Sequence, residues 1–86
     1  MPRFIAAHTL PMDEAQFMAM ANDMVPKIPA GFTWKSTYCA FGDSKLFCEW
    51  DAPSKEALEQ AFKANNFPFD AVYEAKLYDV ASKVMQ

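Results

Sequence analysis

The sequence predicts an α+β domain in which four strands form one antiparallel-type sheet and two helices cover one of its faces. Strand-like and helix-like segments alternate in the order strand, helix, strand, strand, helix, strand, and a turn-rich segment joins the two middle strands. The chain has 86 residues, which suffice for one domain over residues 1–86 and leave no room for a second.

The first half of the chain begins with a predicted strand at Arg3–Thr9. Asp13, with Gln16 three residues later, is typical of the capping box that starts a helix. Apolar residues then recur at helical spacing as far as Val25, and Pro26 ends the helix because proline cannot continue the hydrogen-bond ladder.

The second half begins with a predicted hairpin. Phe32–Phe41 and Leu46–Trp50 are rich in aromatic residues, and Gly42–Lys45 between them is typical of a turn. Ser54 caps a second helix, and Ala71–Val80 forms the last strand. This order is that of a ferredoxin-like βαββαβ sandwich, whose two long crossovers place both helices on the same side of the sheet.

The composition predicts an additional buried surface. Apolar residues make up 52% of the chain and aromatic residues 15%, more than two helices can hide from water. The other face of the sheet is bare in this architecture. We therefore expect two copies of the chain to associate as a homodimer through that open sheet face.

Charge and hydropathy exclude two classes of partner. The net charge of −3 and the absence of a basic cluster argue against nucleic acid, and no apolar run is long enough to cross a bilayer. The N-terminal residues Met1–Phe4 lack the features of a signal peptide. With only two cysteines, these features predict a cytoplasmic protein.

Alternation along the strands assigns side chains to the two faces once a register is chosen. If Gly42 pairs with Lys45, Cys39 lies opposite Cys48. The helix side is then expected to hold Cys39, Phe41, Leu46, Cys48, Trp50, Tyr73, Ala75 and Leu77. The open face is expected to hold Trp34, Ser36, Tyr38, Phe47, Glu49, Val72, Glu74, Lys76 and Tyr78.

The first strand alternates without a clear apolar side. We assign His8 to the open face, because an unpaired imidazole buried beneath two helices is costly. We also expect the first strand to run parallel to the third and antiparallel to the fourth. This arrangement brings His8 close to Glu74 and to Glu49 or Asp51.

His8, Glu49 and Glu74 are the predicted metal ligands. Neutral imidazole and carboxylates accept divalent transition metals such as nickel, zinc or iron. The alternative without a metal is a histidine paired with a carboxylate and water at a dimer interface.

The same residues support an enzyme as the alternative function. A carboxylate that orients His8 would leave its second nitrogen free to move a proton. Trp34, Tyr38, Phe47 and Tyr78 flank His8 and predict a pocket for a small aromatic or polyketide-like substrate. Packing between two copies explains the same aromatic residues without a substrate.

Cys39 and Cys48 have two interpretations. Facing cysteines on neighbouring strands could form a disulfide or bind a metal as thiolates. In a reducing compartment they are instead two small buried hydrophobic residues.

Several segments resemble a group of small bacterial domains, largely of unassigned function, that includes a nickel-binding protein. They are Met1–Ile5, His8–Pro11, Phe32–Trp34 followed by Ser36, Lys45–Ser54 and Asn66–Asp70. The resemblance implies a ferredoxin-like fold, a homodimer and binding of nickel. A broader likeness is to dimeric α+β barrels, which include cofactor-free monooxygenases, isomerases and cyclases and pack two sheets open face to open face.

Overall fold

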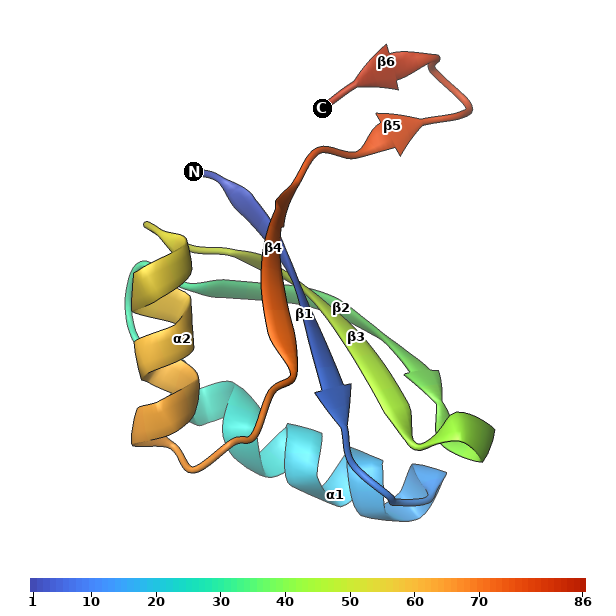
Figure 1. The fold of residues 1–86 in the computed structure, drawn as a ribbon, viewed down its shortest axis with the longest axis vertical. Coiled ribbons are helices and arrows are strands. Elements are labelled where there is room, and N and C mark those ends of the chain that lie inside the picture. Colours follow the sequence, from blue (N-terminus) through green and yellow to red (C-terminus); the bar gives the residue numbers. More distant parts are fainter.

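The computed structural model describes residues 1–86, and its elements follow the predicted order (Figure 1). The main elements are β1 (Arg3–Thr9), α1 (Glu14–Met24), β2 (Thr33–Ala40), β3 (Lys45–Asp51), α2 (Lys55–Ala64) and β4 (Ala71–Ala75). Short 3-10 turns at Val25–Lys27 and Phe41–Asp43 follow α1 and β2, and a small hairpin of β5 (Tyr78–Asp79) and β6 (Val84–Met85) ends the chain. The predicted α+β, ferredoxin-like class is confirmed.

Both helices begin where their capping residues predict. The Asp13 carboxylate accepts from the backbone N–H of Gln16 at 2.8 Å, and the Gln16 side chain accepts from the Asp13 backbone N–H at 2.9 Å. The Ser54 hydroxyl accepts from the Ala57 backbone N–H at 3.0 Å. Such caps satisfy otherwise unpaired N–H groups and each stabilise a helix by about 1 kcal/mol.

The four main strands form one sheet in the order β2-β3-β1-β4, with every neighbouring pair antiparallel. The prediction that the first strand runs parallel to the third was therefore wrong. Each crossover helix returns the chain to the same end of the sheet, so β1 runs in the direction of β2, and the β2–β3 hairpin then opposes β3 to β1. As a result His8 lies opposite Leu46, whereas Glu49 lies opposite Ile5.

The register of the β2–β3 hairpin also differs from the prediction. Thr37 lies opposite Cys48 and Cys39 opposite Leu46, so the two cysteines do not face each other. The connection Phe41–Ser44 forms a 3-10 turn that ends with Ser44 in the left-handed conformation (φ 55°). The loop is therefore longer than the predicted two-residue turn, and pairing shifts by two residues without exchanging the faces.

A β-bulge in β2 changes the face of one predicted open-face residue. Trp34 lies opposite Trp50 and Ser36 opposite Glu49, so Lys35 is the extra residue. The bulge turns Trp34 toward the helices, where its ring stacks on Trp50 with centroids 5.6 Å apart. The assignment of Trp34 to the open face was wrong for this reason.

The faces of β4 are opposite to those predicted. Val72, opposite Ala6, is only 2% exposed beneath the helices, whereas Tyr73, opposite Ile5, is 60% exposed on the other face. The strand also ends at Ala75 and does not continue to Val80. The sequence of this edge strand is compatible with either set of alternate residues facing the helices. Pairing with β1 decides which set does.

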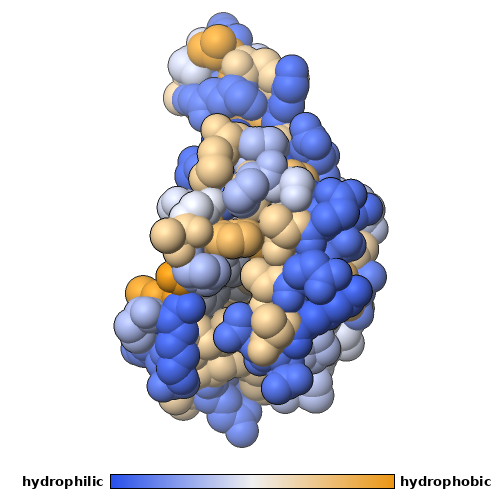
Figure 2. Space-filling view, turned by 90° about the vertical axis from the view of Figure 1, so that its left-hand side faces the viewer, coloured by the Kyte–Doolittle hydropathy of each residue, from blue (hydrophilic) through white to orange (hydrophobic).

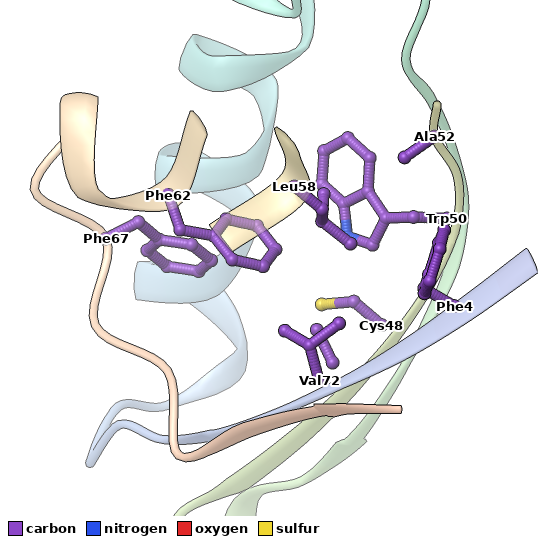
Figure 3. Close-up of a cluster of buried hydrophobic side chains, with 9 residues drawn as sticks. Phe4, Cys48, Trp50, Ala52, Leu58, Phe62, Phe67 and Val72 are labelled. Atoms are coloured by element: carbon purple, nitrogen blue, oxygen red, sulfur yellow. The ribbon is translucent and has the colours of Figure 1, made fainter. Parts of the chain in front are cut away.

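The core lies between the sheet and the helices (Figure 3). Its buried members are Phe4, Ala6, Cys48, Trp50, Ala52, Leu58, Phe62, Phe67 and Val72. Helix α2 buries Leu58 and Phe62, whereas α1 contributes only partly buried side chains. Full burial of a large apolar side chain stabilises a fold by roughly 1.5–3 kcal/mol, so α2 holds the sheet more firmly than α1 does.

The C-terminal hairpin projects beyond the sheet as an arm (Figures 1 and 2). Its backbone bonds join Leu77 to Gln86 and Lys83 to Asp79, all within the arm itself. Tyr78, Val80, Val84 and Met85 leave most of their surface exposed there.

Candidate functional site

His8 lies on the helix side of the sheet and is fully buried, so its assignment to the open face was wrong. Its ring packs against Phe62 and Phe67, with centroids 5.2 and 4.6 Å away. Nδ1 lies 2.7 Å from the carbonyl oxygen of Pro68, which can only accept, so this nitrogen carries the proton. The sequence could not reveal this partner, because the loop that supplies it lies 60 residues away.

The second ring nitrogen of His8, Nε2, is buried without a hydrogen-bond partner. Burial lowers the pKa of His8 and outweighs the Pro68 hydrogen bond and the Asp70 charge, which both raise it. The imidazole is therefore neutral at physiological pH, with a free lone pair among aromatic rings.

The structure does not bring His8, Glu49 and Glu74 together. Glu49 lies on the opposite face of the sheet, and Glu74 is an exposed residue of the edge strand, opposite Phe4. The chain contains no cluster of three or more His, Cys, Asp or Glu side chains able to hold a metal ion. The predicted cluster depended on parallel pairing of the first and third strands, which the antiparallel register replaces.

The predicted pocket residues are likewise divided. Tyr38 and Phe47 are neighbours on the outer face and are 74% and 41% exposed. Trp34 lies on the helix side, and Tyr78 lies in the C-terminal arm. None of the cavities in the structure is lined by Tyr38 or Phe47.

Both cysteines are free thiols. Cys48 is buried and accepts a hydrogen bond from the Thr37 hydroxyl at 3.2 Å, and that hydroxyl in turn accepts from the Trp34 indole at 2.7 Å. Burial raises the pKa of Cys48 to about 11, and burial also raises that of Cys39. Because metals bind the thiolate, these pKa values disfavour metal binding by either cysteine.

The outer surface of the sheet, here called the open face, has an apolar centre. Its central side chains are Ile5, Ala7, Tyr38, Phe47 and Tyr73. The register assigns them together, since alternate residues of each strand project to the same side. Of these, the three aromatic residues are large and exposed.

Ion pairs border this apolar centre. Arg3 Nε lies 2.9 Å from Glu49 Oε2 without the alignment of a hydrogen bond, and both side chains are mostly shielded from solvent. Lys35 Nζ, from the bulge, lies 3.2 Å from Asp51 Oδ2. The sequence analysis did not identify the Arg3–Glu49 pair, although the alternation of Arg3 with Ile5 places Arg3 on the same side as Ile5.

Comparison with known proteins gives one match. A family described as nickel responsive protein SCO4226-like matches residues 3–75. The chain belongs to this family. No curated protein and no solved structure matches the chain. The family match covers β1 to β4 and leaves the C-terminal arm outside.

Membership of the nickel responsive family raises the question of which side chains could bind nickel. The only imidazole is buried with one nitrogen already bonded, the thiols are held protonated, and no three His, Cys, Asp or Glu side chains lie close enough to hold a metal ion. A single chain therefore does not present a donor set that fits a nickel ion. No helix of the chain has the length and apolar character needed to cross a membrane.

Proposed function

We propose that the protein is a homodimer that binds a divalent metal ion, foremost nickel, with carboxylates that two copies contribute across their open faces. The observation that carries this proposal is the contrast between the two faces of the sheet. The helix side is covered by α1 and α2 (Figure 1), whereas the open face leaves Tyr38, Phe47 and Tyr73 exposed beside Glu49 and Asp51. Membership of the nickel responsive family is the reason for naming nickel as the ion.

The exposed aromatic side chains support association through this face. Monomeric proteins seldom leave a contiguous apolar patch of this kind in water, and aromatic residues are enriched at the centres of interfaces. Sheets pack face to face at about 10 Å when their side chains interdigitate. A two-fold pair would bury the three aromatic residues of each copy.

The carboxylates of β3 supply suitable donors. Glu49 and Asp51 project from the same face, two residues apart and thus about 7 Å along the strand. Their present partners are Arg3 and Lys35, so a divalent ion would have to displace these two cations from the carboxylates. Because one chain lacks a group of three ligands, a complete site needs donors from both copies.

Calorimetric titration of chelator-stripped protein with nickel tests this proposal. We expect one ion bound per two chains, with affinity reduced at least tenfold by Glu49→Gln, because that change removes a donor from each copy. Glu56→Gln, an exposed carboxylate on α2, is the matched control and should bind as the wild type does.

Three outcomes would contradict the proposal: no saturable binding, one ion per chain, or equal affinity in Glu49→Gln and the control. A His8→Gln variant that stays folded but loses nickel would move the site to the helix side. That result would also overturn the proposal.

A further inference from the structure

A cavity of about 180 Å³ lies on the helix side of the sheet, between the end of α1 and α2. Eight of its twelve lining residues are hydrophobic, among them Met24, Ile28, Phe32, Trp50, Leu58 and Phe62. The side of the molecule drawn in Figure 2 shows a column of apolar atoms between hydrophilic side chains. The cavity has no part in the proposed metal site, which uses the opposite face of the sheet.

The helix layer leaves this space open because its two helices pack unequally. Helix α1 has no buried residue and is followed by the 3-10 turn Val25–Lys27, which contains Pro26. Figure 1 shows α1 running across the end of α2. The partly buried side chains of Met24, Ile28 and Phe32 line the corner between them.

We propose that this cavity binds a small, uncharged, mostly apolar molecule of about the size of one substituted aromatic ring. The volume of the cavity indicates the size of the ligand, since a cavity of about 150 Å³ lined by Leu, Ile and Phe is known to accept benzene. The lining indicates that the ligand is mostly apolar, because apolar walls offer a water molecule few hydrogen-bond partners.

Trp50 contributes an aromatic ring to the wall of the cavity. Its side chain is 5% exposed and lines the cavity, yet its indole N–H has no nitrogen or oxygen acceptor. Only the thiol of Cys48, a weak acceptor, lies near it. The indole nitrogen is itself shielded from solvent, so a ligand in the cavity contacts the ring and not the N–H group.

The rim of the cavity determines the charge of the ligand. Asp23 and Lys27, both at the rim, form an ion pair with 3.0 Å between Lys27 Nζ and Asp23 Oδ2. The two charges cancel, so neither an anion nor a cation is attracted. Asn65, the remaining polar rim residue, is neutral.

The test uses toluene and phenol as probes, read by thermal denaturation and by NMR of the Met24, Ile28 and Leu58 methyl groups. At a concentration about tenfold above Kd, the melting temperature should rise by roughly 5 to 10 °C. Toluene should bind at least as tightly as phenol, because a mostly apolar lining does not compensate for the lost hydration of the phenol hydroxyl. The methyl shifts should be saturable.

Two leucine variants of α2 identify the site. Ala61 lines the cavity, so Ala61→Leu fills it and should abolish both readouts. Ala64→Leu places the same side chain at an exposed position outside the cavity and should keep them. The proposal is overturned if neither probe stabilises the wild type, or if Ala61→Leu binds as well as Ala64→Leu does.

Discussion

The contacts that bury the imidazole of His8 also hold it in the neutral form. Phe62 and Phe67 exclude water from the ring, and the Pro68 carbonyl takes its one proton. A charged imidazole would need a partner for Nε2, and none is present. His8 is therefore a structural residue of the helix side, whose ionisation opposes folding.

The lowered pKa of His8 predicts that the protein loses stability in mild acid. In the unfolded chain His8 takes up a proton near pH 6.5, whereas the folded chain resists protonation to lower pH. The contribution of neutral His8 to the free energy of unfolding is thus fully present above about pH 6.5. It is lost as the pH falls toward the pKa of His8 in the folded chain, by at most about 1.4 kcal/mol per pH unit.

Urea denaturation at a series of pH values measures this slope. His8→Phe keeps an aromatic ring in place and removes the proton site, so its stability should vary less between pH 6.5 and 5. His8 is the only histidine, so no other side chain has its ordinary pKa in that range. Equal slopes for the two proteins would show that His8 is not the cause.

At the scale of elements, local signals predicted the helices, and long-range pairing decided the rest. The capping residues Asp13 and Ser54 lie next to the helices they start, so the sequence alone was sufficient for them. The direction of β1 against β3 follows from connections elsewhere in the chain. The predicted grouping of His8 with Glu49 assumed that β1 and β3 are parallel. Because the two strands are antiparallel, different residues lie opposite each other.

The bulge at Lys35 is a second feature that the sequence alone could not predict, here within one strand. Period-two alternation has no means to indicate a single extra residue, and every position on the N-terminal side of it changes face. Trp34 is the residue affected here. The sequence offered Trp50 on the helix side as a stacking partner, but the register needed to bring the two together was not available from it.

Deletion of Lys35 should remove the bulge and leave Trp34 opposite Trp50, because Trp34 then directly precedes Ser36 and the two alternate in face without an extra residue. We expect a loss of less than about 1 kcal/mol in the free energy of unfolding, since the variant keeps the stacked indoles and loses only the partly exposed ion pair with Asp51. Trp34→Ala removes the indole and its stacking on Trp50, so it should cost roughly 2 kcal/mol or more. Comparable losses in the two variants, measured in urea, would refute this account of the bulge.

The whole molecule is a sheet with two unlike surfaces. One is covered by helices and encloses the core and the cavity, and the other carries exposed aromatic residues framed by ion pairs. The family match spans both surfaces but ends before the C-terminal arm. Association of two copies would leave the helix side, with its cavity, free.

Association predicts that thermal stability depends on protein concentration, since mass action favours the dimer. The wild-type melting temperature should rise with concentration, and Phe47→Lys should remove that dependence by placing a charge at the centre of the open face. Met18→Lys, an exposed position on α1, is the control and should behave as the wild type does. A wild-type melting temperature independent of concentration would contradict the dimer.

The burial of the one histidine has a practical consequence for experiments with nickel. Incidental adsorption of proteins to immobilised nickel resins arises chiefly from surface imidazoles, and the folded chain presents none. An untagged native preparation should therefore show little background retention. Retention that disappears with Glu49→Gln would report a specific site, whereas retention that appears only after denaturation would report exposure of His8.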